Sequence, residues 1–356
     1  MDFFAFAQSN KKLINDALTG FFINEINACK TNVRKRNIRF LQEYSLIGGK
    51  RLRPIAAILS YNAFDKHDSK ILMPALATEL LHTSTLIFDD IMDEDDYRRG
   101  QKGIQLKLKE SKTAFDKKYN GNIFPSYTKK YAASMAILIG LNTEYYYRKL
   151  IYDSILSNDE KMACLRILDK AYKELICGQE QDIEFETTNP TEEEYLEMVK
   201  LKTAVLFAAS LEIGAYLAGA KEKDCLLVKK YGELIATAFQ IQDDLLDIDV
   251  GSKKGHEIGS DIKSGKKTLL YINTLNKTAE KDLSIIGKTF GNKDSTIKDI
   301  KDVILLYTNN GSIEHCKKKM SGLLKDGKEI LNKLDIPNEK KLLIHDFSIT
   351  LANREK

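Results

Sequence analysis

The spacing of apolar residues is the sequence feature that most limits how this chain can fold. Apolar side chains recur three and four positions apart, for example at Phe88 and Met92 and again at Leu227, Tyr231 and Leu234. Alternating patterns typical of strands are scarce, and the 356 residues include only five prolines. The pattern therefore predicts an all-α protein of roughly a dozen helices.

Hydrophobic residues make up 43% of the chain, which is enough for one large domain or two ordinary ones. No strong linker and no solenoid-type repeat divides it. Pro54 and Pro74 suit the first turns of helices, and Thr191 suits an N-cap. Two segments have the composition of loops, the lysine-rich residues 102–130 and the glycine- and lysine-rich residues 249–267.

Composition also points to a cellular compartment. A formal net charge of +4 is small for this length, so a nucleic-acid partner is not expected. The five cysteines lie far apart and include no CxxC pair, as is typical of a reducing compartment. The N-terminus does not resemble a signal peptide. The longest apolar segment, residues 204–220, is interrupted by Glu212, which favours a core helix over a membrane span. We therefore expect a soluble, cytoplasmic protein.

Two aspartate clusters at the ends of apolar helices are the strongest functional signal. In the first, Asp89 and Asp93 are four residues apart, so on a helix both carboxylates lie on one face, with Asp90 beside them. Like charges at this spacing repel each other, so a cation is expected between them. A single cluster of this kind is more often a charged helix end or surface.

A second copy of the pattern greatly weakens that simpler interpretation. Asp243, Asp244 and Asp247 repeat the spacing on another apolar helix. Mg²⁺ prefers oxygen ligands and commonly joins one or two carboxylates to substrate phosphates. Two such helices that face each other could hold one diphosphate through bridging metal ions. No EF-hand spacing fits either cluster.

Cationic groups suited to a diphosphate occur in four short motifs. Each alone could be a solvated surface patch, so the combination with two acidic clusters carries the argument. The groups are Lys50, Arg51 and Arg53 beside two glycines; Arg98 and Arg99; Lys202 with Thr203; and Lys263, Lys266 and Lys267.

Together these motifs resemble the trans-isoprenyl (polyprenyl) diphosphate synthase family, and geranylgeranyl diphosphate synthases within it. The matching segments follow the family's order and are GGKRLRP (48–54), ELLHTSTLIFDDIMDEDDYRRG (79–100), GQEQDIEFE (178–186), KLKTA (200–204), FQIQDDLLDI (239–248) and GSDIKSGKKTLL (259–270). The resemblance implies a single isoprenoid synthase domain over residues 1–356, an all-α bundle around a central cavity, with residues 102–130 as a loop insertion. It also implies a homodimer. We expect no membrane span, and peripheral contact with a membrane could accompany product release.

The resemblance further implies the reaction. An allylic diphosphate (dimethylallyl, geranyl or farnesyl) ionises, its carbocation alkylates isopentenyl diphosphate, and loss of a proton leaves a trans product one isoprene unit longer. Mg²⁺, three ions with substrate bound, would stabilise the charge on the leaving diphosphate. A dry apolar cavity would protect the cation from water.

The resemblance assigns roles to individual residues. Metal ligands would be Asp89, Asp93, Asp243 and Asp247, with Asp90 and Asp244 in support. The allylic diphosphate would be held by Arg98, Lys202 and Lys266, and isopentenyl diphosphate by Lys50, Arg53, His82 and Arg99. Thr203 and Gln240 would present dipoles to the developing cation, and Gln179 and Asp182 would border the allylic site. For His82 the simpler alternative is a satisfied core histidine.

The residues before the first aspartate predict product length. Ser84 and Thr85 lie five and four positions before Asp89, and both are small, so a growing chain could pass them until Leu81. Residues 145–147, three tyrosines, could form a deeper floor or simply be core. We expect a product of at least four isoprene units, geranylgeranyl diphosphate or longer.

Some positions depart from the family pattern. His256 stands where a lysine is usual, so Lys253, Lys254 or a protonated His256 would replace it. The residues that follow the RRG motif (98–100) differ from those usual in the family, and Leu141 and Asn142 replace a frequent Gly-Asp pair.

Three other interpretations of the chain remain: a terpene cyclase, a squalene- or phytoene-type synthase, and a non-catalytic partner subunit of a heteromeric synthase.

Overall fold

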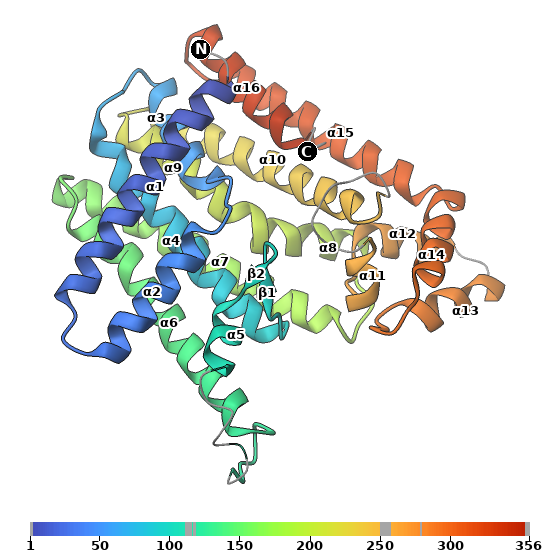
Figure 1. Ribbon diagram of the computed structural model, residues 1–356. Helices are drawn as coiled ribbons and strands as arrows, with labels where there is room; N and C mark the ends of the chain where they lie inside the picture. Colours follow the sequence, from blue (N-terminus) through green and yellow to red (C-terminus); the bar gives the residue numbers. More distant parts are fainter. Residues whose placement is uncertain (1–2, 111–115, 117–118, 250–257, 278–279, 353–356) are drawn as a thin grey trace. The chain divides into compact units, whose positions relative to one another are not determined.

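Helix boundaries follow local capping signals. The computed structural model describes residues 3–110, 116, 119–249, 258–277 and 280–352 (Figure 1). Several helices begin at an N-cap whose side-chain oxygen accepts a hydrogen bond from the backbone N–H three residues later. Among these N-caps are Thr31, Ser126, Thr191 and Thr296. At Thr191 the bond is reciprocated by Glu194, which completes a capping box and confirms the predicted helix start.

The chain forms two compact units, Met1–Ile58 with His67–Arg166, and Leu59–Lys66 with Ile167–Lys356. The all-α prediction is confirmed, because the described residues form strands only in one hairpin, whose two strands have two residues each. That all the residues make one domain stays a prediction.

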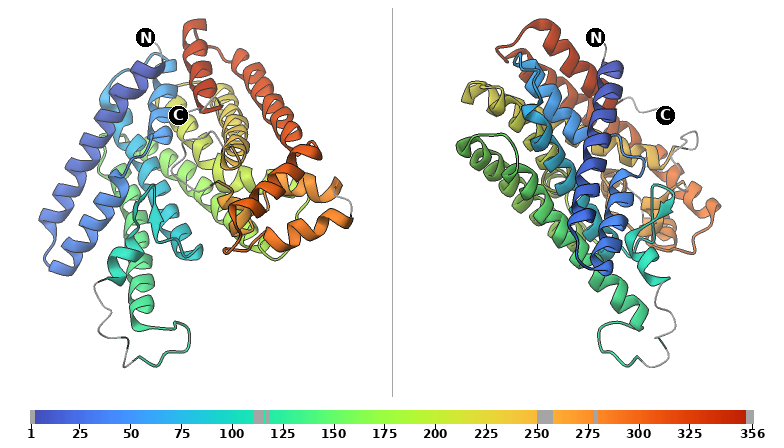
Figure 2. Two further views of the ribbon diagram at one scale, coloured as in Figure 1. Left: turned by 45° about the vertical axis from the view of Figure 1, so that its right-hand side comes forward. Right: turned by 60° about the vertical axis from the view of Figure 1, so that its left-hand side comes forward.

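The first unit is built from long helices. Its α1 and α2 pack side by side, and α4 packs along α6 (Figure 2). Its elements are α1 (Phe3–Ala28), α2 (Asn32–Leu46), the start of α3 (Leu52–Ala63), η1 (Ser69–Ile71), α4 (Leu72–Met92), β1 (Tyr97–Arg98), β2 (Gln101–Lys102), α5 (Ile104–Lys109), α6 (Tyr127–Tyr152) and the start of α7 (Asn158–Phe185).

Helix α4 carries the first aspartate cluster and is buried on most of its surface. Pro74 lies in its first turn, where a missing N–H costs no helical hydrogen bond. Residues 69–92 are long and apolar enough to cross a membrane, but 67% of their apolar window is buried inside the protein. A core helix of a soluble protein meets the same description.

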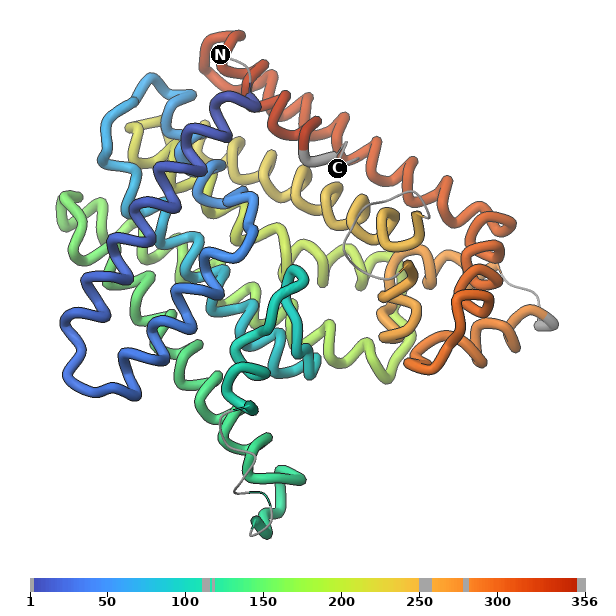
Figure 3. The backbone as a smooth tube through the Cα atoms, viewed as in Figure 1, coloured from blue at the N-terminus to red at the C-terminus, as the bar shows by residue number. Residues whose placement is uncertain are grey.

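The second unit is organised around α10 (Glu222–Asp247), which packs against both α9 (Val205–Leu217) and α15 (Ser312–Asn332) (Figure 3). Helix α9 falls within the apolar segment 204–220 and is almost wholly buried, as predicted for a core helix. The other elements are the end of α7, α8 (Glu192–Val199), the π-helix η3 (Lys200–Ala204), α11 (Ser260–Ser264), α12 (Leu269–Lys277), α13 (Glu280–Thr289), α14 (Ile297–Asn309) and α16 (Asn338–Ala352).

The two segments predicted as loops contain short helices. Within residues 102–130, α5 and the beginning of α6 are helical, and residues 119–126 connect to α6. Within residues 249–267, the described part includes α11. His256, Lys253 and Lys254 lie outside the described residues.

Candidate active site

The last turn of α4 brings Asp89 and Asp93 onto one face, as their spacing predicts. Asp93 is the C-cap of the helix, and its N–H donates to the carbonyl of Asp89 at 2.9 Å. The side chain of Asp89 is 20% exposed and Asp93 is exposed. Two carboxylates one turn apart are therefore presented at a helix end that water and ions can reach.

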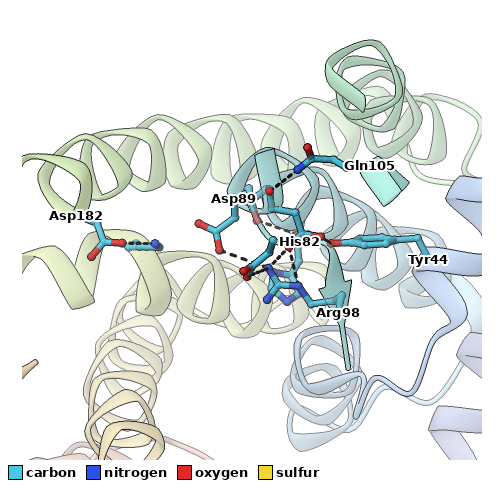
Figure 4. A network of polar contacts seen from close by, with 10 residues as sticks. Tyr44, His82, Asp89, Arg98, Gln105 and Asp182 are labelled. Atoms are coloured by element: carbon cyan, nitrogen blue, oxygen red, sulfur yellow. Dashed lines mark hydrogen bonds and ion pairs between the residues drawn. The ribbon is translucent and has the colours of Figure 1, made fainter. Parts of the chain in front are cut away.

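Asp90 lies between them in sequence but points into the protein. It is 3% exposed, and its carboxylate accepts hydrogen bonds from the hydroxyl of Tyr44 at 2.7 Å and from Nε of Arg98 at 2.8 Å (Figure 4). The amide of Gln105 donates to its backbone carbonyl. Burial raises the pKa of Asp90, although Arg98 and Tyr44 oppose the shift. Asp90 thus fixes Arg98 rather than presenting its carboxylate to solvent.

A β-hairpin places the two arginines that follow the cluster. Strands β1 and β2 pair Tyr97 with Lys102 and Arg98 with Gln101. The turn residues Arg99 and Gly100 both have positive φ, 52° and 73°, as a tight type I′ hairpin turn requires. Arg98 Nη2 lies 3.9 Å from Asp89, and Arg99 donates to the carbonyl of Ile47 at 2.6 Å. This hairpin was not predicted from the sequence.

Arginines from the GGKRLRP segment cluster with Arg99 around His82. Arg51 is 2% exposed and forms an ion pair with Glu79 at 2.6 Å, so its role is structural. Nε of Arg53 is buried without a hydrogen-bond partner among the described residues. Burial lowers the pKa of Arg53 to about 10, with Arg99 adding to the effect and Glu79 opposing it.

His82 reports the electrostatic character of this cluster. Its pKa is lowered well below the usual 6.5, first by burial and then by the positive charges of Arg53 and Arg99. A neutral histidine among arginines marks a region with excess positive charge, which suits an anion. A Cβ on Gly49 would lie 2.7 Å from Nη1 of Arg51 and 2.8 Å from Nη1 of Arg99, so the guanidinium groups pack directly on this glycine.

In the second unit, a π-helix displays Lys202. Its ammonium group contacts the carboxylate of Asp182 on α7 at 2.5 Å (Figure 4). A Cβ on Gly178 would lie only 2.3 Å from the backbone nitrogen of Lys202, so α7 approaches the π-helix at closest range there. Single π turns frequently occur at functional sites. Sequence periodicity did not reveal this one.

In the second aspartate cluster, as in the first, the second aspartate is buried and accepts hydrogen bonds from protein donors. Asp243 is half-buried, whereas Asp244 is 4% exposed and accepts hydrogen bonds from the hydroxyl of Tyr195 and from Nε2 of Gln240 at 3.0 Å. Oε1 of Gln240 in turn accepts a hydrogen bond from Thr203 at 3.2 Å. Burial, with a contribution from Asp261, raises the pKa of Asp244 to about 6 against the opposing charge of Lys266.

Asp247 anchors the segment that follows α10. It accepts hydrogen bonds from the Ser260 hydroxyl at 2.5 Å and from the Asp261 N–H at 3.0 Å, at the start of α11. Lys266 lies 3.9 Å from Asp261, whereas Lys267 stacks over Tyr271. A small cavity in this region is lined by residues that include Asp244, Asp247, Asp261, Lys266 and Tyr307.

Residues proposed to set product length occupy different environments. Leu81 and Ser84 are fully buried, and Ser84 donates to the carbonyl of Leu81 at 2.7 Å. Thr85 is half-buried. In α6, the predicted floor divides: residue 145 is exposed, whereas Tyr146 and Tyr147 are buried.

The oxygen donors fit Mg²⁺. Within the part of the chain that the structure describes, no group of three or more His, Cys, Asp or Glu side chains could hold a metal on its own. Asp89 and Asp93 offer two carboxylates on one accessible helix turn. Such incomplete sites suit an ion that takes its remaining ligands from water and substrate phosphates.

Three structurally important residues were missed by sequence reasoning. Each contacts the second aspartate of a cluster from a position 15 to 49 residues away; they are Tyr44, Gln105 and Tyr195.

The remaining predicted site residues differ in their exposure to solvent: Lys50 is exposed, and Gln179 and Asp182 are half-buried.

Comparison with known proteins gives concordant matches. Residues 35–307 match the family model described as polyprenyl synthetase. A geranylgeranyl diphosphate synthase from Methanosarcina mazei is 36% identical over 307 residues, which cover 85% of this chain and 86% of that protein.

Solved structures are similar over the whole chain. A geranylgeranyl pyrophosphate synthetase from Pyrococcus horikoshii matches with a TM-score of 0.84 and 28% identity, covering 99% of this chain and 98% of its own. A geranylgeranyl pyrophosphate synthase from Corynebacterium glutamicum, complexed with isoprenyl diphosphate and magnesium, matches with a TM-score of 0.88 and 26% identity, covering 99% and 100%.

Proposed function

The chain belongs to the polyprenyl synthetase family, and we propose that it condenses isopentenyl diphosphate with allylic diphosphates to make an all-trans polyprenyl diphosphate. The proposed product is geranylgeranyl diphosphate or longer, consistent with the names of the similar proteins from M. mazei and P. horikoshii. The terpene cyclase, squalene- or phytoene-type and silent-subunit alternatives find no support in these matches.

One observation carries the proposal. In each unit an aspartate cluster ends an apolar helix, and the second aspartate is buried and bound by protein donors. The side chains of Asp89, Asp93 and Asp243 are at least partly exposed. Asp89, Asp93 and Asp243 would hold Mg²⁺, with Asp247 contributing through the α11 turn. When bound, the metal would neutralise charge on the diphosphate as it leaves.

Substrate binding is proposed for the surrounding cations. Arg98, Lys202 and Lys266 would contact the allylic diphosphate. Asp90 and Asp182 hold the first two in place, which limits the entropy lost when substrate binds.

The cluster of Arg53, His82 and Arg99 would take isopentenyl diphosphate, together with the exposed Lys50. A bound anion there would satisfy the buried Nε of Arg53, and it would offset the positive charges that add to burial in lowering the pKa of His82. An anion that balances these positive charges is favourable, which supports the assignment of isopentenyl diphosphate to this cluster.

The chain's remaining contribution is to stabilise the carbocation and exclude water. Thr203 and Gln240, joined by a hydrogen bond at 3.2 Å, would direct oxygen lone pairs toward the developing positive charge. The buried Leu81 and Ser84 would form part of the apolar wall along which the product grows. Gln179 would border the allylic site.

We also propose a single domain, a cytoplasmic homodimer and three Mg²⁺ ions with substrate bound. Incubation of the purified protein with isopentenyl diphosphate, each allylic primer and Mg²⁺, followed by chromatography of the products, tests the proposal. Products of twenty carbons or more support it, and absence of condensation with every primer contradicts it. Mainly fifteen-carbon product would contradict the assigned length.

A further inference from the structure

We propose that Tyr195 is a positioning residue that acts through Asp244 to hold Gln240 and Thr203 in the orientation needed for prenyl transfer. The inference rests on the proposed function, and it adds to it a residue on α8 that the sequence motifs did not identify.

Three hydrogen bonds link Tyr195 to Thr203. The Tyr195 hydroxyl donates to Oδ2 of Asp244, and Oδ1 of Asp244 accepts from Nε2 of Gln240 at 3.0 Å. Oε1 of Gln240 accepts from the Thr203 hydroxyl at 3.2 Å. The series thus connects α8, α10 and the π-helix η3.

While Asp244 is ionised, the donors and acceptors can be arranged in only one direction. Burial raises the pKa of Tyr195 well above its usual value, so its phenol keeps its proton and donates. A carboxylate that accepts at Oδ1 requires the NH₂ of Gln240 to face it, which turns the Gln240 carbonyl toward Thr203. Thr203 then donates its proton to that carbonyl and keeps its oxygen lone pairs for a positive charge.

The position of Tyr195 is itself firmly set. It is 1% exposed within a cluster of buried residues that includes Met198, Val199 and Ile241. Its N–H donates to the carbonyl of Thr191 at 3.0 Å, directly after the capping box that begins α8. A rigid hydroxyl is therefore held against Oδ2, which prevents the Asp244 carboxylate from rotating.

The first aspartate cluster shows the same construction independently. There the buried second aspartate, Asp90, accepts a hydrogen bond from the hydroxyl of Tyr44 at 2.7 Å and positions Arg98. In both clusters a buried tyrosine holds the second aspartate.

Replacing Tyr195 by phenylalanine tests the proposal, since Tyr195→Phe keeps the ring in the core and removes only the hydroxyl. We expect kcat to fall by roughly 10- to 100-fold while KM for both diphosphates stays within about threefold, because orientation rather than binding is lost. Tyr231→Phe is the matched control. Tyr231 is equally buried, and its hydroxyl donates to the carbonyl of Ile344 at 2.9 Å, outside this network. Its kcat is expected to stay within about twofold of wild type.

A double-mutant cycle distinguishes positioning from a general structural effect. If Tyr195 acts through Thr203, then Tyr195→Phe should cause little further loss of kcat in a Thr203→Ala background. The proposal would be overturned if the kcat losses of Tyr195→Phe and Thr203→Ala multiplied in the double variant, or if Tyr231→Phe lost as much kcat as Tyr195→Phe.

A crystal structure of Tyr195→Phe gives a readout that does not depend on activity. Rotation of the Asp244 carboxylate, with loss of the Gln240–Asp244 hydrogen bond, supports the proposal. Retention of that bond and of the Gln240 orientation overturns it. If the wild-type protein transfers no prenyl group, the proposed function fails, and the crystal structure alone decides whether Tyr195 positions Gln240.

Discussion

Replacement of Gly178 by alanine should damage the site without changing any side chain that is proposed to contact substrate. A Cβ at this position would lie 2.3 Å from the nitrogen of Lys202 and 2.8 Å from the carbonyl carbon of Leu201. Ordinary contacts begin at 3.4 Å, and both atoms belong to the backbone, so α7 and the π-helix must separate by about 1 Å.

The magnitude follows from two opposing effects. Overpacking costs about 1–3 kcal/mol, and backbone contact places this case toward the upper end. Alanine in a helix gains about 1 kcal/mol over glycine. The expected net loss of about 2 kcal/mol corresponds to a Tm lower by roughly 3 °C for a chain of 356 residues. Because Lys202 moves with the π-helix, kcat should fall by on the order of 100-fold.

Thermal unfolding and steady-state kinetics measure the two effects. Gly322→Ala in α15 is the matched control, because nothing lies within 4 Å of its Cβ. That variant should gain up to about 1 kcal/mol and keep its activity. Wild-type Tm and kcat in Gly178→Ala would refute the inference that close approach of α7 holds Lys202 in place.

Three further results are expected. Ser84→Phe should shorten the main product, as seen by chromatography, because it fills the proposed tunnel; an unchanged product distribution counts against that assignment. Arg51→Met should destabilise the fold by about 3–5 kcal/mol in chemical denaturation, because it leaves Glu79 buried without its cation. Arg53→Met should instead leave Tm near wild type and raise KM for isopentenyl diphosphate at least about 10-fold. Equal effects of the two variants on stability would contradict a structural role for Arg51 and a substrate-binding role for Arg53. Because the pKa of His82 is lowered in the folded protein, the unfolded chain binds a proton at His82 more readily, so stability should fall as pH drops below 6.5. His82→Gln should therefore make the denaturation midpoint depend less on pH between about pH 5 and 7. An unchanged pH dependence of the midpoint would show that His82 does not cause the loss of stability.

Local sequence patterns predicted the helices and the aspartate clusters because both depend on short-range spacing. The four-residue step from Asp89 to Asp93 closes one helical turn in the structure, with a hydrogen bond of 2.9 Å. The Thr191 cap and the buried segment 204–220 were likewise found from neighbouring residues.

Long-range features could not be predicted in this way. Tyr44 and Tyr195 reach Asp90 and Asp244 from 46 and 49 residues away, and no local pattern marks a tyrosine whose partner lies on another helix. The π-helix lies against α7 at Gly178, a contact between segments that the local KLKTA pattern does not reveal. The hairpin has one local signal in the sequence, the glycine after Arg99, which suits a turn with positive φ.

The most direct test of the central claim is product analysis with paired aspartate variants. Wild-type protein supplied with isopentenyl diphosphate, farnesyl diphosphate and Mg²⁺ should form geranylgeranyl diphosphate or longer chains, and chelation of the metal should stop the reaction. The Asp89→Ala/Asp243→Ala double variant should fold normally and form none. Prenyl transfer that survives in this variant would contradict a mechanism built on the two aspartate clusters.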